Sequence, residues 1–301
     1  MQTTEIRIGN KQSLALDLSD FRWYSHEYCN GGRGLIALAQ DHWSVDFKET
    51  LKRCTAFLKT TKNLTPTHFI APKTREQEVR VKKQNQQRAL QLIDRAKPIG
   101  GTVAERYLRK RKIDTSALPP SALRQLGFVA SCYHKATNSN FPALVTTVRD
   151  HANAPIAVHR IYLTQNAHKA PVAPNKLSLG STKGASIHLT SARETLILTE
   201  GLEDGLTIVQ AMRHDKNIGL WCGIGSSLTS IIIPKDTVRC VVLAVDNDPA
   251  GRGYIKELAP RLTREGFRVC IAVPTHGKDF NEMLCRYGRF FNLTLMEKYN
   301  D

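Results

Sequence analysis

From residue 194 onward the chain alternates short apolar runs with amphipathic segments, and this alternation limits the possible folds more than any other feature. The runs TLILTE, IGLWCGI, CVVLAVD and RVCIAVP have the length and the apolar content of buried strands. The segments DGLTIVQAMR, SSLTSIII, AGRGYIKELAPRLTREG and KDFNEMLCRYG follow them in turn and are each predicted to be helical. Repeated strand–helix units of this size predict an α/β fold, with a mostly parallel sheet and helices on both faces.

The residues before 194 show a different pattern of apolar and polar positions. FPALVTTVRD and APIAVHRIYL alternate apolar and polar positions and predict an antiparallel hairpin. A helix is expected to begin near Thr102, with Thr102 and Glu105 forming a capping box. The predicted parts are, in order, a small N-terminal module (1–70), a charged and solvated helical linker (71–97), a basic α+β subdomain (98–192) and the α/β domain (193–301).

Charge is the most unusual property of the composition. The 301 residues include 43 Lys and Arg against 27 Asp and Glu, a formal net charge of +16. Such an excess favours a polyanionic partner, and nucleic acid is the leading candidate. The sequence has no secretory signal pattern, no bilayer-spanning apolar run and no CxxC pair among its seven cysteines. We therefore expect a cytoplasmic protein with reduced thiols and no membrane partner.

Acidic residues follow three of the predicted strands at the sheet edge where functional groups gather in α/β folds. These residues are Glu200 and Asp204, Asp246 and Asp248, and Asp279 and Glu282. Asp246 and Asp248 are two residues apart, so both carboxylates are expected on one side, where a cation would offset their repulsion. Hard oxygen ligands without Cys or His at ligand spacing favour Mg²⁺ or Mn²⁺. The alternative for VDNDPAGR is a plain Asx turn.

The order and spacing of EGLEDGL, GIGSSLT, AVDNDPAGR and GKDFNEML resemble those of a Toprim domain, the fold shared by DnaG-type primases, topoisomerases and some nucleases. The similarity is to the primase branch found in phages, plasmids and other mobile elements. It extends over about residues 98–295, because GTVAERYLRKRKI resembles the helix that opens a primase core. The segment from FPALVTTVRD to GSTKG likewise resembles the basic hairpin region that precedes Toprim in these cores.

The resemblance implies roles for the acids. Glu200 matches the catalytic acid that is proposed as a general acid or base, and Asp246 and Asp248 match the metal-binding pair. Asp204 and Asp279 match further acids of the metal site. Glu200 is also expected among the metal ligands, and Asp246 and Asp248 are counted as catalytic as well.

One position departs from the primase pattern. Asn281 stands where primases often have a second aspartate, so one negative charge is lost there, and Glu282 is a candidate to compensate for it. Gly277 and Lys278 are expected to shape this loop, and Lys278 can also contact a phosphate.

Basic residues are expected to hold nucleotide or template. Arg149 and Arg160 match arginines of the primase hairpin, whereas Lys176 and Lys183 align with basic positions less securely. RYLRKRKI predicts a basic helix face that follows a phosphate backbone. The alternative for all of these residues is ordinary solvated charge. The candidates are Arg106, Arg109, Arg111, Arg149, Arg160, Lys176, Lys183 and Lys278.

The N-terminal stretch FRWYSHEYCNGGRGLIALAQ predicts a hairpin that leads into a helix, and it resembles the corresponding part of primase zinc ribbons. Only Cys29 and His26 stand near ligand positions, so a four-ligand zinc site is not expected. We interpret this module as degenerate and metal-free.

Three functions remain open from the sequence. The first is a primase-like nucleotidyltransferase, of the DNA-directed RNA polymerase type, that makes short primers on single-stranded DNA from nucleoside triphosphates for a mobile element. The second is a metal-dependent Toprim nuclease, and the third is a non-catalytic nucleic-acid-binding protein. No Walker A pattern is present, so a replicative helicase would be a separate partner.

Overall fold

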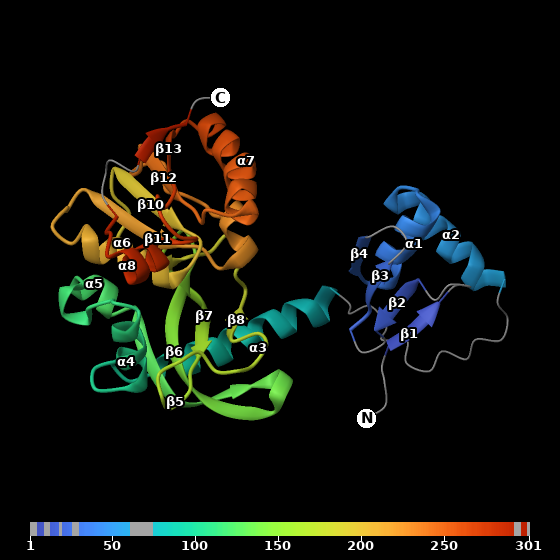
Figure 1. Ribbon diagram of the computed structural model, residues 1–301, viewed down its shortest axis with the longest axis horizontal. Coiled ribbons are helices and arrows are strands. Elements are labelled where there is room, and N and C mark those ends of the chain that lie inside the picture. Colours follow the sequence, from blue (N-terminus) through green and yellow to red (C-terminus); the bar gives the residue numbers. More distant parts are fainter. Residues whose placement is uncertain are drawn as a thin grey trace. The chain divides into compact units, whose positions relative to one another are not determined.

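The computed structural model describes residues 5–8, 13–17, 20–25, 30–60, 75–291 and 296–299. The chain divides into two compact units, Met1–Pro72 and Lys73–Asp301. Each unit is described by itself below (Figure 1).

The first unit is a small antiparallel sheet followed by two helices. Its strands pair in chain order, and Trp23 and Leu16 are buried between them. The predicted hairpin and helix of this stretch are confirmed, whereas His26 and Cys29 lie outside the described residues. The elements are β1 (Glu5–Ile8), β2 (Leu14–Asp17), β3 (Arg22–Ser25), β4 (Asn30–Arg33), α1 (Leu35–Trp43) and α2 (Phe47–Thr60).

The second unit opens with a long helix and a four-stranded antiparallel sheet in the order β5-β6-β7-β8. The predicted hairpin is confirmed as β6–β7. The elements are α3 (Arg75–Asp94), α4 (Val103–Lys110), η1 (Thr115–Ala117), α5 (Pro120–Leu123), β5 (Leu126–His134), η2 (Lys135–Thr137), β6 (Ser139–Arg149), β7 (Pro155–Tyr162) and β8 (Lys176–Gly180).

The helix α3 is part of this unit rather than a solvated linker along its whole length. Ala89 and Leu92 are buried, and they pack against Val158 and Tyr162 on one face of the antiparallel sheet. The apolar positions are few, but they are concentrated in the second half of the helix. None of the described helices combines the length and the apolar character needed to cross a membrane.

The start of α4 differs in detail from the expected capping box. Thr102 is the N-cap, and its hydroxyl accepts a hydrogen bond from the N–H of Ala104 at 3.2 Å. Glu105 accepts from the N–H of Gly101 instead of that of Thr102, at 2.7 Å. The helix therefore begins where the sequence predicts, but both contacts of the expected capping box are shifted by one residue.

The rest of the second unit is the predicted α/β domain, a six-stranded sheet in the order β14-β13-β12-β10-β11-β9. The four inner strands are parallel, and the two edge strands β9 and β14 are antiparallel to their neighbours. The elements are β9 (Ile187–His188), β10 (Thr195–Thr199), α6 (Leu202–Ala211), β11 (Ile218–Cys222), η3 (Gly225–Ser230), β12 (Cys240–Ala244), α7 (Pro249–Arg264), β13 (Arg268–Ala272), α8 (Phe280–Tyr287) and β14 (Met296–Lys298).

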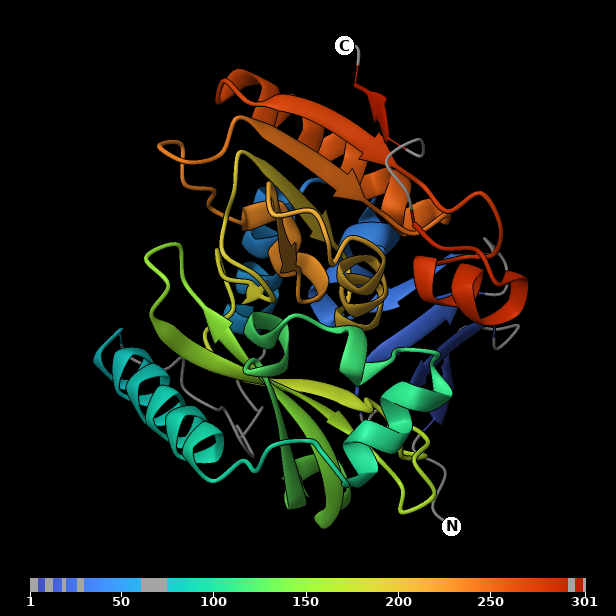
Figure 2. The ribbon, with the colours of Figure 1, turned by 90° about the vertical axis from the view of Figure 1, so that its left-hand side faces the viewer.

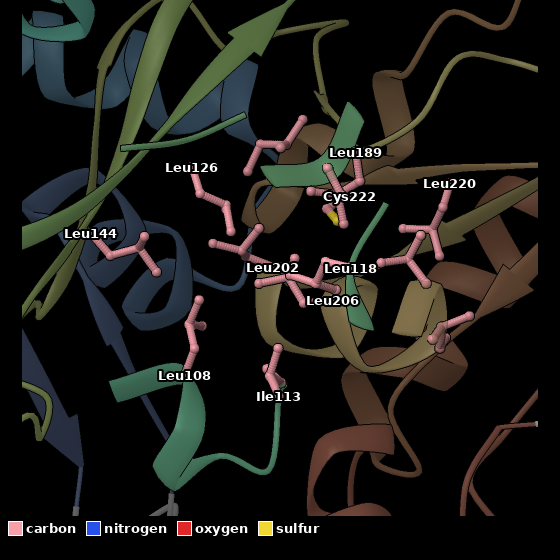
Figure 3. Packing of buried hydrophobic residues seen from close by; sticks show 14 of the residues in the cluster. Leu108, Ile113, Leu118, Leu126, Leu144, Leu189, Leu202, Leu206, Leu220 and Cys222 are labelled. Carbon is pink, nitrogen blue, oxygen red and sulfur yellow. The ribbon is translucent and has the colours of Figure 1, made fainter. Parts of the chain in front are cut away.

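Helices cover both faces of this sheet (Figure 2). Leu206 of α6 and Met283 of α8 belong to the core on one face, and Leu258 and Leu262 of α7 belong to the core on the other. The first of these cores also includes residues of the antiparallel subdomain, such as Leu144. Figure 3 shows Leu108, Leu126 and Leu144 on the same apolar cluster as Leu202, Leu206 and Leu220. The two halves of the second unit therefore share one core.

Gly205 lies where α6 crosses β11 most closely. A Cβ at this position would overlap the Sγ of Cys222 and would lie 3.1 Å from methyl carbons of Leu189 and Leu220. The helix can approach the sheet this closely only because residue 205 has no side chain.

We expect Gly205→Ala to lower the free energy of unfolding by about 1–3 kcal/mol, because the added methyl overpacks the shared core. Gly253→Ala is the matched control. Gly253 is also helical, but nothing lies within 4 Å of the position of its Cβ. The control should be neutral or stabilising by up to about 1 kcal/mol. Urea denaturation of both variants checks this, and equal stabilities would contradict the packing argument.

Candidate active site

Two parallel strands bring the first acids together. Thr199 at the end of β10 is in register with Ala244 at the end of β12, so the residues that follow emerge side by side. The Oε1 of Glu200 accepts a hydrogen bond from the backbone N–H of Asp246 at 2.9 Å. The predicted meeting of Glu200 and Asp246 at the carboxyl end of the sheet is therefore a feature of the structure.

Asp248 is the N-cap of α7, and its Oδ1 accepts from the N–H of Gly251 at 2.9 Å. The chain does turn here, but as the N-cap of α7 rather than as a plain Asx turn, and this cap lies inside the acid cluster. At Gly251 a Cβ would overlap the carbonyl oxygen of Asp246 and lie 3.0 Å from Oε1 of Glu200. Glycine allows the helix to begin directly against the two acids.

The loop before α8 adds the third group. The Nζ of Lys278 lies 3.0 Å from Oδ2 of Asp248 and 3.8 Å from Oδ2 of Asp246. Its carbonyl oxygen accepts from the N–H of Asn247 at 2.7 Å, and its own N–H donates to Glu282 at 2.7 Å. These contacts hold the loop beside the two aspartates.

Asp204 and Asp279 complete the cluster. Asp279 is the N-cap of α8, and its Oδ1 accepts from the N–H of Glu282 at 2.6 Å. Asp204 lies in the first turn of α6, and its Oδ1 accepts from the N–H of Asn281 at 2.9 Å. The structure thus brings together all five acids that the sequence predicts for the site.

Negative charge accumulates in this cluster. Burial raises the pKa of Glu200, and the charges of Asp246 and Asp248 raise it further. The N–H of Asp246 acts in the opposite direction, and the resulting pKa is about 7. Burial and the carboxylate of Asp279 raise the pKa of Asp246 to about 6, and the same two causes raise the pKa of Asp204 to about 8. The N–H of Gly251 and the ammonium of Lys278 lower the pKa of Asp248.

The donor set is suited in its chemistry to a hard divalent cation, because it consists of carboxylate oxygens and holds excess negative charge. The ammonium of Lys278 lies between Asp246 and Asp248, where a cation would contact both. Among the described residues, no three His, Cys, Asp or Glu side chains are arranged to hold a metal ion.

Asn281 has a structural role in this protein. It is 1% exposed. Its Nδ2 donates to the carbonyl of Arg111 and to the hydroxyl of Thr207, each at 2.9 Å. Its Oδ1 accepts from Nη1 of Arg111 at 3.1 Å. The amide therefore joins α8 to the end of α4, and both of its polar atoms are engaged there.

Sequence reasoning missed a buried polar contact beside the site, which is made by Glu203. This residue is 4% exposed, and its carboxylate lies 3.1 Å from Nζ of Lys169 and 2.9 Å from Nζ of Lys176. The hydroxyl of Tyr107 donates to the same carboxylate at 2.8 Å. Burial acts to raise the pKa of Glu203, but the two ammonium groups and the hydroxyl lower it well below its usual range.

The predicted basic residues separate into different places. Lys176 is paired with Glu203, and Lys278 with Asp246 and Asp248. Arg160 lies on the same face of its sheet as Val158 and Tyr162, which is the face that packs against α3. Its Cζ atom lies 5.6 Å from the centroid of the Tyr162 ring. Arg149 lines a separate cavity with Arg124. Their binding roles stay predictions, but Arg149 and Arg160 do not adjoin the acids.

The basic residues in and just after α4 also lie in different surroundings. Arg106, Arg109 and Lys110 are exposed, as is Lys183 in the loop after β8, while Arg111 is turned inward to Asn281. Tyr107, Lys110, Arg111, His168 and Lys169 line a hollow of about 250 Å³ beside Glu203. This basic hollow places several positive charges next to the acid cluster.

Family models match both halves of the second unit. Residues 195–289 match the Toprim domain, and residues 83–189 match a domain of unknown function, DUF7146. The α/β part of this protein is therefore a Toprim domain. No match was found among curated proteins.

Several solved primase structures are similar to the chain. The Aquifex aeolicus primase (zinc-binding and RNA polymerase domains) matches at 15% identity and TM-score 0.49, over 92% of this chain and 72% of that one. The primase fragment of the bacteriophage T7 primase-helicase protein matches at 15% and 0.44, over 93% of each chain. A DNA primase domain from Pseudomonas aeruginosa matches at 14% and 0.46, over 66% and 74%.

We expect Glu203→Ala to lower the free energy of unfolding by about 3–5 kcal/mol, because Lys176 and Lys169 would lose their buried counter-charge. Glu257→Ala on the exposed side of α7 is the control, with an expected change within about 0.5 kcal/mol. Chemical denaturation near neutral pH measures both. A loss below about 1 kcal/mol in Glu203→Ala would contradict a stabilising role for this contact.

The raised pKa of Asp204 predicts a pH-dependent stability. The folded chain holds this proton more tightly than the unfolded chain, so between about pH 4 and about pH 8 the folded state binds more protons. The stabilising contribution is complete at the acid end of this range and is lost as the pH rises. Asp204→Asn cannot ionise, and its Oδ1 can still accept from Asn281.

At about pH 8 in metal-free buffer, Asp204→Asn should therefore be more stable than the natural chain by at least about 1 kcal/mol. At about pH 4 the advantage should vanish, because both side chains are then neutral. Denaturation curves at the two pH values provide the measurement. A difference that does not change with pH would show that the effect is one of packing rather than ionisation.

Proposed function

We propose that this protein is a primase-like nucleotidyltransferase that joins nucleoside triphosphates into short primers on single-stranded DNA. The observation that carries the proposal is the convergence of Glu200, Asp204, Asp246, Asp248 and Asp279 at the carboxyl end of a Toprim sheet. The basic hollow beside these acids and the net charge of +16 support a phosphate-bearing substrate and a nucleic-acid partner.

Asp246 and Asp248 would hold Mg²⁺ or Mn²⁺, with Asp204 and Asp279 as further acids of the metal site. The ion would neutralise phosphate charge and so favour in-line attack by a hydroxyl group. The ammonium of Lys278 contacts Asp246 and Asp248, and because it is exposed it can turn toward a phosphate.

Glu200 is suited to proton transfer. Its pKa of about 7 lies near neutral pH, where a carboxyl group can both take up and release a proton. Its position is fixed by the N–H of Asp246 and by the close approach of α7 at Gly251. We assign it the role of general acid or base for the attacking hydroxyl or the leaving group.

The basic hollow would bind the triphosphate. Lys110 at the end of α4 and Arg111 directly after it line the hollow together with His168 and Lys169 from the loop after β7. Arg106 and Arg109, exposed on the same helix, are placed to follow a template backbone. A separate replicative helicase and a mobile genetic element are the partner and the setting that this function implies.

The proposal is tested with labelled nucleoside triphosphates on mixed-sequence single-stranded DNA in Mg²⁺ or Mn²⁺, with the template labelled separately. The natural chain should make short products. Asp246→Asn should lower the rate by on the order of 10²-fold or more, because the site loses a metal ligand. Asp236→Asn, an exposed aspartate in the loop before β12, should retain the full rate.

The same assay distinguishes the alternatives. Shortening of the template without synthesis, lost in Asp246→Asn, would make the protein a Toprim nuclease. DNA binding with neither reaction would show that the acid cluster is not catalytic. Equal synthesis by the two variants would refute the assignment of the site.

A further inference from the structure

A cavity of about 340 Å³ lies at the β9 edge of the six-stranded sheet, against the turn between β6 and β7. We call it the β9-edge cavity. Its polar lining includes Arg124, Arg149, His151, Asn153 and His188, with Trp221 in its wall. The volume is within the range of small-molecule sites in proteins.

This cavity is separate from the acid cluster. The acids follow β10, β12 and β13, whereas the cavity lies at β9, with β11 between β9 and β10. It is also lined by Ser191, whose carbonyl oxygen adjoins Gly219 near the start of β11. It therefore extends toward the amino end of the parallel strands, opposite the acids.

Positive charge predominates in the lining of the cavity. Its lining contains two arginines and no Asp or Glu. Arg149 donates from Nη1 to the carbonyl of Asn153 at 2.9 Å and from Nε to Gln125 at 3.4 Å. Within the described part of the chain, neither Arg124 nor Arg149 has a carboxylate at ion-pair distance. Guanidinium groups in such a setting match the geometry of phosphate oxygens.

His188 gives independent evidence for a ligand. It is 6% exposed, and its ring is stacked on Trp221 with 3.7 Å between centroids and 5° between planes. Its Nδ1 lies 3.2 Å from Oδ1 of Asn153. Its Nε2 is buried and has no hydrogen-bond partner among the described residues. A buried nitrogen without a hydrogen bond destabilises the fold, and a hydrogen bond to a ligand atom would offset that cost.

The imidazole ring of His188 can carry its proton on Nε2 and so donate a hydrogen bond from that atom. Burial and the nearby Arg149 lower the pKa of His188 to about 4, so the ring is neutral near pH 7. The amide of Asn153 can present either its oxygen or its nitrogen to Nδ1, and with its nitrogen there the ring proton lies on Nε2. The indole N–H of Trp221 donates to the carbonyl of Thr190 at 3.1 Å and so fixes the stack.

We propose that the β9-edge cavity is a phosphate-binding site in which Arg124, Arg149 and the Nε2 of His188 hold the phosphate oxygens. The phosphate belongs either to a free nucleotide or to the backbone of single-stranded DNA, since both present the same oxygens. The site uses none of the acids and needs no metal ion. The proposal for this cavity can therefore be tested independently of primer synthesis.

The test is calorimetric titration of the full chain in buffer with EDTA, which keeps metal-dependent binding at the acids out of the measurement. The probes are inorganic phosphate, adenosine monophosphate and a short oligothymidylate. Arg124→Gln should raise the dissociation constant of the bound probe by about tenfold, because one charge-assisted contact is lost. His188→Phe keeps an aromatic ring against Trp221 and removes both ring nitrogens, and it should raise the constant by about fivefold or more.

Arg264→Gln is the charge-matched control, because Arg264 is exposed near the end of α7, away from the cavity. Phosphate or the monophosphate responding to Arg124→Gln but not to Arg264→Gln would identify a free-nucleotide site. The same response with the oligonucleotide alone would identify a backbone site. Absence of binding by all three probes, or equal affinities in Arg124→Gln and Arg264→Gln, would overturn the proposal.

Discussion

The buried carboxylate of Glu203 is the contact on which the arrangement of the second unit depends. It joins α6 of the Toprim domain to Tyr107 of α4 and to Lys169 and Lys176 of the antiparallel subdomain. Removal of the carboxylate would leave the two ammonium groups without their buried counter-charge. The apolar core that the Toprim domain shares with the antiparallel subdomain stabilises their association, but hydrophobic packing is non-directional. The contacts of Glu203 fix one orientation between the two.

Two consecutive residues of α6 show how local surroundings decide the state of a carboxyl group. The pKa of Glu203 is lowered because two ammonium groups offset its burial, and the pKa of Asp204 is raised because burial is joined by the charge of Asp279. One side chain is therefore a permanent anion in the fold, while its neighbour belongs to a cluster that holds excess negative charge. The first stabilises the protein, and the second is where a cation is expected to bind.

The two candidate sites place different chemistry at two separate positions on the sheet of the Toprim domain. Carboxylates gather at the carboxyl ends of β10, β12 and β13, and two arginines with a buried histidine line the cavity at the β9 edge. Phosphates would meet the first site with the help of a cation and the second directly through guanidinium groups. Most of the remaining positive charge lies on exposed side chains such as Arg106 and Lys183.

The sequence by itself determined the α/β domain, the order of its strands along the chain and the acids at their ends. Strand and helix patterns of apolar residues are local in the sequence. Parallel strands place their carboxyl ends at the same edge of the sheet regardless of how the rest of the chain packs. Only the tertiary structure decided that Arg160 faces α3, that Asn281 is a buried tie to Arg111, and that Glu203 is the central ion pair. Those roles depend on contacts between residues about 30 to 170 positions apart, and a local pattern carries no information on which distant side chain will meet which.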